Sequence, residues 1–357
     1  MGWKDRQILI LVLSVLLWAC VKDKPAKVNT PAGKAGSVYI VCEGNFGNGD
    51  ATLYSYDKKS DSVYGDLYKA ANGQSLGDVF QSMRRIGDSL YLCINNSDKI
   101  VVLHALTHRF AGQINIPKPR YIVPLSTDKA FVSTLYSNKV YTINPKTLFL
   151  TGEMTFPHNN PEGMCISGSN LYVCPWDTTC NKIYSTDVTS GIATQAITLT
   201  GYAPHAVLTD REQMLWVLSG NVTKGRQAVL SRVDPSTGSV VKTYTFPAGT
   251  DPIKPVFNAT RDTLYFIQVK YDGTNTNNGI YRMHLHDAAL PATPFISANT
   301  YQYFWALGID PATGDIYVGD PKGFSQKGTV TIYKSDGMPI RTFTVGLGPG
   351  QFYFETQ

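Results

Sequence analysis

The sequence predicts an all-β protein, a seven-bladed β-propeller in which each blade is a four-stranded antiparallel sheet. Short strands that carry an aromatic residue recur seven times, at Tyr39, Tyr91, Phe131, Tyr172, Trp216, Tyr265 and Tyr317. The intervals between these anchors run from 40 to 52 residues, which is the spacing of propeller blades. A β-helix would repeat at about 20–25 residues, and a sandwich would not repeat.

The segments that follow the anchors have the pattern of further strands joined by turns. Alternating apolar and polar residues follow at 99–103, 139–143 and 329–333. Turn residues come next, as in Asp234-Pro235-Ser236-Thr237-Gly238, where Pro presets φ and Gly supplies a positive φ. No window keeps a helical period, and 76–85 is the best helical candidate.

The two ends of the repeat region predict how the ring closes. The first repeat begins at Ser37 with its anchor strand and lacks an innermost strand before it. Residues 350–354 read as a strand that has no later partner in the sequence. We therefore expect the last strand to complete the first blade, which would leave no open edge at the joint, and we expect removal of this strand to impair folding.

The N-terminus predicts a lipoprotein signal. Lys4 and Arg6 precede an apolar run that ends at Cys20, and this run is too short to cross a membrane as a helix. The sequence Leu17-Trp18-Ala19-Cys20 resembles a bacterial lipobox, in which the cysteine is acylated, and several acyl chains would anchor the protein to a membrane. An ordinary secretory signal is the alternative.

The chain is thus divided into three parts. We expect a signal peptide at 1–19, a lipidated tether at 20–36 and the propeller at 37–357. The net charge is +5, or +4 without the signal peptide, and the propeller contains no block of like charge. Nothing in this pattern favours a nucleic-acid partner.

The cysteines permit one disulfide without demanding it. Cys174 and Cys180 could close a small loop in an oxidising compartment. Cys42, Cys93 and Cys165 lie in apolar strands, where a buried thiol is expected. No His and Cys residues have the spacing of a zinc site.

Blade topology predicts the place of a ligand site. The innermost strand precedes each anchor by about ten to twelve residues, and its start opens onto one face of the central channel. Alignment on the anchors places one residue of each blade there: Gln81, Arg120, Glu162, His205, Lys254, Trp305 and Gln351. Different polar groups around one pore suit a specific small-molecule site, although a water-filled channel is also lined by polar residues.

Loops on the same face add aromatic and amide side chains. The candidates for ligand contact are Phe46, Asn96, Tyr136, Trp176 and Tyr271; each is alternatively a residue of a solvated turn. Together they suit a large, partly flat ligand that forms hydrogen bonds, and they suit a simple metal ion less well.

Catalytic patterns are weak in this sequence. No Ser, His and Asp residues fall in a recognisable order, and Glu162 is the only acid among the seven aligned positions. A calcium-dependent propeller hydrolase needs several acids at one ion, and Arg120, His205 and Lys254 would repel it. We therefore expect no enzyme, no metal site and no catalytic cofactor.

Two segments resemble a known group of proteins. Residues 38–47, Val-Tyr-Ile-Val-Cys-Glu-Gly-Asn-Phe-Gly, and residues 72–83, Asn-Gly-Gln-Ser-Leu-Gly-Asp-Val-Phe-Gln-Ser-Met, are similar to the opening of the YncE-like, surface-layer-type propeller lipoproteins of Bacteroidetes. The similarity runs over essentially the whole mature chain. Within that group the chain resembles the BtuG-type proteins, which capture cobalamin at the cell surface and hand it to a TonB-dependent outer-membrane transporter.

The resemblance implies a ligand, a partner and a location. The motifs are specific to the lipoprotein group and less specific to cobalamin, and Cys42 stands where a polar residue is expected. Topology offers Arg120 or Lys254 for the phosphate of a corrinoid, and Trp305, Trp176 or Tyr271 for its flat faces. Residues 21–24 match a surface-export signal in part, which favours the outer face of the outer membrane over the periplasmic leaflet.

Three functions compete on this basis. The first is a non-enzymatic surface lipoprotein that captures a corrinoid or another scarce nutrient for a transporter. The second is a propeller scaffold that docks a protein or a cell-envelope glycan. The third is a propeller hydrolase, which would need a metal or a pair of acids that the pattern does not supply.

Overall fold

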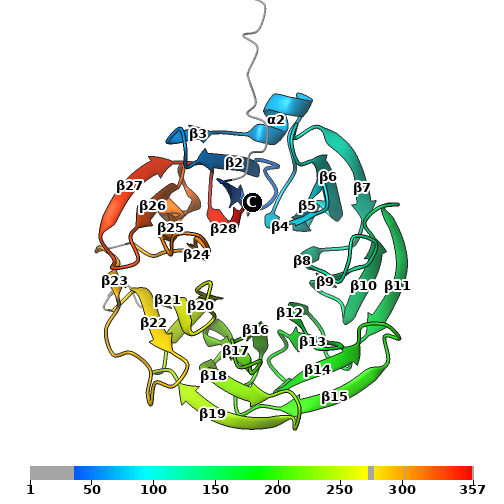
Figure 1. The fold of residues 1–357 in the computed structure, drawn as a ribbon, viewed down its shortest axis with the longest axis vertical. Coiled ribbons are helices and arrows are strands. Elements are labelled where there is room, and N and C mark those ends of the chain that lie inside the picture. The colour runs from blue at the N-terminus through cyan, green and yellow to red at the C-terminus, as the bar shows by residue number, and fades with distance from the viewer. Residues whose placement is uncertain (1–35, 272–276, 301, 356–357) are drawn as a thin grey trace, which may run out of the picture.

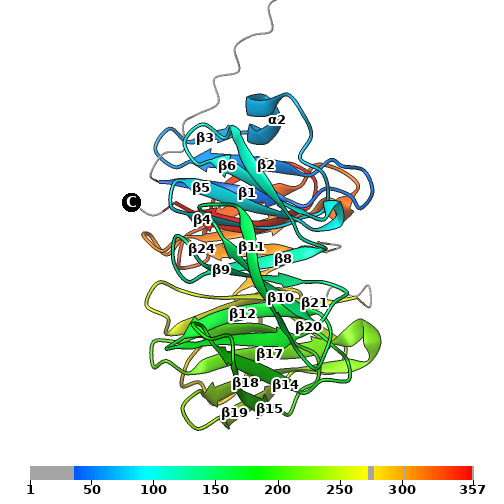
Figure 2. The same cartoon turned by 90° about the vertical axis from the view of Figure 1, so that its right-hand side faces the viewer.

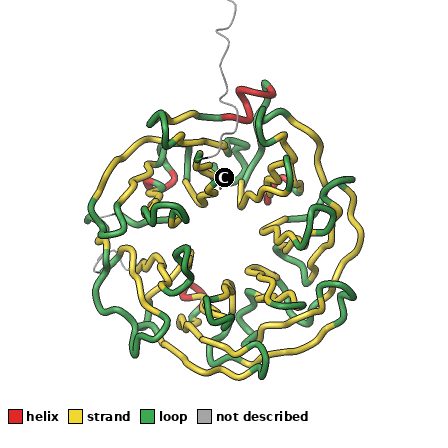
Figure 3. Tube along the Cα trace, in the orientation of Figure 1, coloured by secondary structure: helices red, strands yellow, loops and turns green. Residues whose placement is uncertain are grey.

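The structure is a computed structural model that describes residues 36–271, 277–300 and 302–355. Within these residues seven four-stranded antiparallel sheets are arranged around a central axis (Figure 1), which confirms the predicted seven-bladed propeller. Figure 2 shows the ring edge-on, with strands running between its two faces. Figure 3 shows that strands and loops account for almost all of the trace. The predicted lipidation site Cys20 lies outside the described residues.

The blades are numbered in chain order, and each is given from its innermost to its outermost strand. Blade 1 is β28 (Pro349–Phe354), β1 (Ser37–Cys42), β2 (Thr52–Asp57) and β3 (Ser62–Tyr64); blade 2 is β4 (Phe80–Ile86), β5 (Ser89–Ile94), β6 (Lys99–His104) and β7 (Phe110–Asn115); blade 3 is β8 (Pro119–Pro124), β9 (Ala130–Thr134), β10 (Lys139–Asn144) and β11 (Phe149–Thr155). Blade 4 is β12 (Pro161–Ser167), β13 (Asn170–Pro175), β14 (Lys182–Asp187) and β15 (Ala193–Thr198); blade 5 is β16 (Pro204–Thr209), β17 (Leu215–Asn221), β18 (Arg226–Asp234) and β19 (Ser239–Thr245). Blade 6 is β20 (Thr250–Phe257), β21 (Thr263–Lys270), β22 (Gly279–His284) and β23 (Ile296–Ser297); blade 7 is β24 (Ala306–Ile309), β25 (Ile316–Asp320), β26 (Thr329–Tyr333) and β27 (Pro339–Thr344).

The ring closes through a sheet built from both ends of the repeat region. The last strand, β28, pairs antiparallel with β1, so that Val38 lies opposite Phe354 and Ile40 lies opposite Phe352. This pairing gives blade 1 its innermost strand and confirms the predicted closure. Every residue of β1 is buried, because it has a strand on either side and a blade on either face.

The hydrophobic core lies in the seams between neighbouring blades. Seven buried clusters occur among the described residues, and each joins two adjacent blades. In the seam between blades 5 and 6, Trp216 stacks on Tyr244 with ring centroids 6.0 Å apart and meets Phe257 edge-on at 6.2 Å. Outer strands are exposed by contrast: Phe149 on β11 is 70% exposed. The aromatic anchors are therefore seam residues and not ligand contacts.

The helical expectation was wrong in its position. Residues 80–85 of the candidate 76–85 belong to strand β4, and the α-helix among the described residues is α2 (Leu67–Asn72). The Asp66 side chain caps α2 by accepting a hydrogen bond from Lys69 N at 3.2 Å. Gly73 ends it with φ 71°, a left-handed conformation that suits glycine. Leu67 and Tyr68 fix α2 against the seam between blades 1 and 2.

The disulfide that the spacing permitted is not formed in the structure. Cys174 and Cys180 are both free, buried thiols. The Cys180 sulfur lies 3.3 Å from both the backbone nitrogen and the carbonyl oxygen of Lys182, and these local contacts hold it in its own loop. Cys42 and Cys93 are buried as expected, and burial raises the pKa of each thiol to about 12, whereas Cys165 is only partly buried.

No helix in the described part of the chain is long and apolar enough to span a membrane.

Candidate ligand-binding site

The upper face is defined here as the face at which the innermost strand of each blade begins. Near these starts the strand pairing is irregular in six blades. In five of them the irregularity falls at Gln81, Arg120, Glu162, His205 and Lys254, and in blade 1 it falls at Gly350, beside Gln351. A β-bulge of this kind re-aims a side chain out of the regular pleat. Five of the seven predicted positions are thus set apart from the seam packing by the backbone itself.

The first group of contacts spans blades 2, 3 and 4. Arg120 Nε donates to Glu162 Oε2 at 2.8 Å, its Nη2 donates to Glu162 Oε1, and its Nη1 donates to Gln81 Oε1. Gln81 Nε2 in turn donates to the Tyr121 hydroxyl at 3.1 Å. Burial disfavours the charge on Arg120, but the Glu162 carboxylate outweighs this effect and raises the pKa of the guanidinium. Arg120 is therefore a paired cation that uses three of its five N–H donors.

The second group spans blades 6, 7 and 1 and includes an acid that the alignment missed. Glu43 follows β1, and its Oε1 accepts a hydrogen bond from Trp305 Nε1 at 2.9 Å. Lys254 Nζ lies 4.0 Å from the same oxygen and 5.6 Å from the Trp305 ring centroid. A side chain at Gly350 would collide with the Glu43 carboxylate, so glycine is required there for this arrangement.

Lys254 is partly buried, and its backbone is strained. Its φ of 53° lies in the left-handed region, which is uncommon for a residue with a side chain. Burial lowers the pKa of its ammonium group; Glu43 opposes this effect and Arg120 adds to it. A close carboxylate at 4.0 Å and a ring face leave the donors of this ammonium group open to another partner.

The third group lies between blades 4, 5 and 6. The Tyr271 hydroxyl donates to Asp251 Oδ2 at 3.1 Å, and the Trp176 ring lies 6.2 Å from the His205 ring. Trp176 Nε1 is anchored to the Gly220 carbonyl at 3.2 Å. Burial lowers the pKa of His205 while the Asp251 carboxylate acts in the opposite direction. Asp251 is a second acid that the alignment missed.

Two of the predicted contacts are tied to the protein instead of being open. Gln351 Oε1 accepts a hydrogen bond from Met83 N at 2.7 Å, which joins blade 1 to blade 2. Asn96 Nδ2 donates to Asp78 Oδ2 at 3.2 Å, and its Oδ1 accepts from Lys118 at 3.3 Å. Both amides contribute first to the scaffold of the upper face.

Phe46 and Tyr136 are the open members of the predicted set. They are 78% and 79% exposed, and Tyr271 is 53% exposed. Large aromatic side chains at such exposure offer flat apolar surface to a partner molecule. Tyr136 is fixed by its backbone, because its N–H donates to Asn160 Oδ1 at 2.7 Å.

The chemistry of this face is that of polar recognition. It combines two ion pairs, two further ionisable groups and three exposed aromatic rings. Residues 36–271, 277–300 and 302–355 contain no group of three or more His, Cys, Asp or Glu side chains that could hold a metal ion. Lys254 offers an anionic group more unused donors than Arg120 does, because Lys254 has one ion pair at 4.0 Å whereas Arg120 already donates three hydrogen bonds.

Comparison with solved structures gives neighbours that share the propeller fold. A quinonprotein alcohol dehydrogenase-like protein from Bacteroides thetaiotaomicron has a TM-score of 0.67 at 16% identity, over 90% of this chain and 78% of its own. The Kuenenia stuttgartiensis hydrazine synthase has a TM-score of 0.58 at 16% identity, over 74% of this chain and 86% of its own. The dihydro-heme d1 dehydrogenase NirN in complex with DHE has a TM-score of 0.58 at 11% identity, over 91% of this chain and 77% of its own. At these identities the likeness shows the fold alone.

No curated protein matches the sequence. One family model matches residues 36–355, which is the complete ring together with one residue on either side of it. Its description is "Domain of unknown function (DUF5074)". Because the match covers nearly the whole chain, this protein belongs to the DUF5074 family.

Proposed function

We propose that the protein is a non-enzymatic lipoprotein that captures a small nutrient ligand on the upper face of the propeller. The proposed ligand is cobalamin or a related corrinoid, and the proposed partner is a TonB-dependent transporter in the outer membrane. The protein would be held there by lipid and would face the cell exterior. The corrinoid, the transporter and the location rest on the resemblance of residues 38–47 and 72–83; the binding role rests on the site itself.

One observation carries the binding role: equivalent positions in the seven blades present six different residue types at the start of the innermost strand, with only glutamine repeated, at Gln81 and Gln351. Five of these positions lie on β-bulges. A ring that served folding alone would need no such variety, whereas an asymmetric ligand needs a different partner on each side. Concave faces with a few directed polar groups are where small molecules bind.

The contacts select one cation for the ligand. A corrinoid presents peripheral amides, a flat macrocycle and, in cobalamin, one phosphate. Arg120 is occupied by Glu162 and Gln81, so Lys254 is the group that supports the proposed phosphate contact. Phe46, Tyr136 and Tyr271 supply the exposed rings for the macrocycle.

Calorimetric titration tests this proposal. The ring is complete within residues 37–354, so a chain that begins at Lys22 contains the whole fold. We expect one-to-one binding of cyanocobalamin, and at least about tenfold weaker binding after Lys254→Gln, because a hydrogen bond to a charged group is lost. Dicyanocobinamide, which lacks the nucleotide phosphate, should bind the native chain and the variant alike.

The matched control is Lys224→Gln, which removes an exposed lysine of blade 5 that is remote from Glu43 and Trp305. It should leave both affinities unchanged. If Lys254→Gln weakened the binding of cyanocobalamin and of dicyanocobinamide equally, the proposed phosphate contact would be rejected, and the corrinoid would remain the proposed ligand. No binding of either compound would reject the corrinoid altogether.

A scaffold that docks another protein is the second candidate. The observation that favours it is the high exposure of Phe46 and Tyr136 together with the internal pairing of Arg120 and Glu162. On this hypothesis the ion pairs stabilise the blades, and the exposed rings form part of a protein interface. Absence of corrinoid binding combined with loss of transporter association after Phe46→Ser and Tyr136→Ser would favour it.

A further inference from the structure

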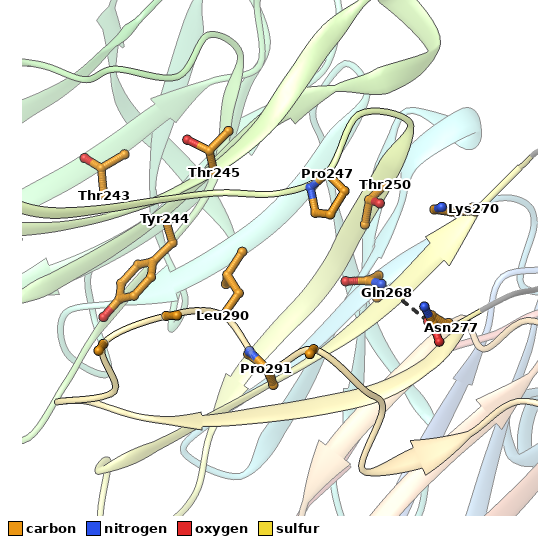
Figure 4. Close-up of a pocket in the computed structure, with 13 residues that line it drawn as sticks. Thr243, Tyr244, Thr245, Pro247, Thr250, Gln268, Lys270, Asn277, Leu290 and Pro291 are labelled. Carbon is orange, nitrogen blue, oxygen red and sulfur yellow. Dashed lines mark hydrogen bonds between the residues drawn. The ribbon is translucent and has the colours of Figure 1, made fainter.

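A groove of about 450 Å³ lies between blades 5 and 6, apart from the three groups of contacts described above (Figure 4). It occurs where blade 6 departs from the repeat. Its outermost strand β23 is only two residues long, whereas β19 of blade 5 has seven. The chain between β22 and β23 runs along the outside of the blade instead (Figure 1), and its residues 288–292 form one wall of the groove.

The opposite wall is polar and is set by strand register. Thr250 on β20 lies directly across from Lys270 on β21, and Pro252 lies across from Gln268. Because side chains two residues apart share a face of a sheet, Thr250, Lys270 and Gln268 project to the same side. Figure 4 shows Thr250 and Gln268 across the groove from Leu290 and Pro291.

The hydrogen bonding of this wall is incomplete at Thr250. The residue is fully buried, and its hydroxyl has no hydrogen-bond partner among the described residues. Burying a hydroxyl without a partner destabilises a protein, and such groups are rare. Lys270 brings an ammonium group to the same wall, with no ion pair to it among the described side chains.

The facing wall is mainly apolar. Its apolar surface comes from Pro247 in the β19–β20 connection and from Leu290, Pro291 and their alanine neighbours in the β22–β23 connection, and residues 243–245 of β19 also line the groove. Polar and apolar sides therefore face each other across the groove, and its volume is within the range of small-molecule sites.

We propose that this groove binds a small amphipathic carboxylic acid. One carboxylate oxygen would pair with the Lys270 ammonium group, the other would accept the hydrogen bond of Thr250, and the hydrocarbon body would lie on Leu290 and Pro291. A single lysine and a single hydroxyl match a monoanion, which favours a carboxylate over a doubly charged phosphate. This inference does not depend on the proposed corrinoid site.

Saturation-transfer difference NMR on the chain from Lys22 onward tests it, with isocaproate as the probe at about millimolar concentration, where weak binding is detected. The comparison compound is isocaproamide, which has the same hydrocarbon body and no charge. We expect saturation transfer to isocaproate to exceed that to isocaproamide at least about fivefold, because the charged pair supports only the acid.

Two variants place the binding in the groove. Lys270→Gln should reduce transfer to isocaproate to the level of the amide, and Thr250→Val, which keeps the shape and removes the hydroxyl, should reduce it in part. Lys224→Gln is the control lysine and should change nothing. Thermal melting of each variant shows whether it folds. If Thr250→Val does not fold, the result for Lys270→Gln alone decides whether the acid binds in the groove.

Three results would overturn the proposal. The first is equal transfer to the acid and the amide, and the second is transfer to isocaproate that persists in Lys270→Gln. The third is the absence of transfer to isocaproate in the native chain.

Discussion

A buried histidine makes the stability of the propeller depend on pH in a way that can be worked out. His108 lies in the turn between β6 and β7, is 1% exposed, and has its Nε2 2.9 Å from the Tyr39 hydroxyl. This contact joins blade 2 to blade 1. Burial lowers the pKa of His108 from 6.5 to about 4, because the imidazolium would lose its hydration without gaining a counter-charge.

The sign and the size of the effect follow from this shift. Above about pH 6.5 the imidazole is neutral in both the folded and the unfolded chain, so its titration has no influence on stability. Below that pH the unfolded chain binds a proton that the folded chain does not accept until about pH 4. Each pKa unit corresponds to 1.36 kcal/mol, so the free energy of unfolding falls by up to about 3 kcal/mol across this window.

Urea unfolding between about pH 7 and about pH 4 measures the effect. In His108→Gln, which retains a polar partner for Tyr39, the free energy of unfolding should decline by about 3 kcal/mol less than in the native chain. His104→Gln is the control, because the His104 side chain is exposed at the end of β6 and forms no ion pair with the described residues, and the pH profile of this variant should match the native one. Superimposable profiles for the native chain and His108→Gln would refute the reasoning.

Three further changes test the fold and the upper face. Phe352→Ala in the closing strand removes a side chain that is 7% exposed and should lower the free energy of unfolding in urea by about 3–5 kcal/mol. Phe149→Ala on the exposed outer strand is the control and should lower it by about 0.5 kcal/mol or less. Similar losses for the two variants would contradict the closure. Glu162→Gln leaves its partner guanidinium without a counter-charge and should lower the free energy of unfolding by about 3 kcal/mol; an unchanged urea midpoint would show that the pair is solvated. Gly350→Ala should displace the Glu43 carboxylate that lies over it and weaken cyanocobalamin binding in calorimetry. An affinity equal to the native one would show that Glu43 does not contribute to the ligand site.

The fold could be predicted from the sequence because it repeats. Anchors such as Tyr39 and Trp216 recur once in each blade, and their burial in the seams follows from that regularity. The closure of the ring by its last strand could be predicted because the first repeat, which begins at Ser37, lacks an innermost strand. The helix α2 was missed although Asp66 and Gly73 are ordinary capping residues, because a six-residue helix leaves too short a period to detect.

The site was predicted in its positions and not in its contacts. Alignment found Lys254 and Trp305, but not Glu43, which follows an anchor strand instead of beginning an innermost one. Glu43 reaches them because Gly350 has no side chain in its path and because the ring brings together residues that are 262 positions apart. Such a meeting depends on register across several blades, which no local pattern in the sequence records.

The pairing of β1 with β28 has a consequence for how the chain acquires its structure. The strand that β1 requires is the last strand of the ring in chain order, so the first blade stays unfinished until the whole ring has been synthesised. Contacts between such distant segments form slowly, because a large loop must close before they are made. Until then the apolar residues of β1 remain open to chaperones or to aggregation. A chain that has lost β28 would therefore leave the apolar residues of β1 exposed, which would mark it as incomplete.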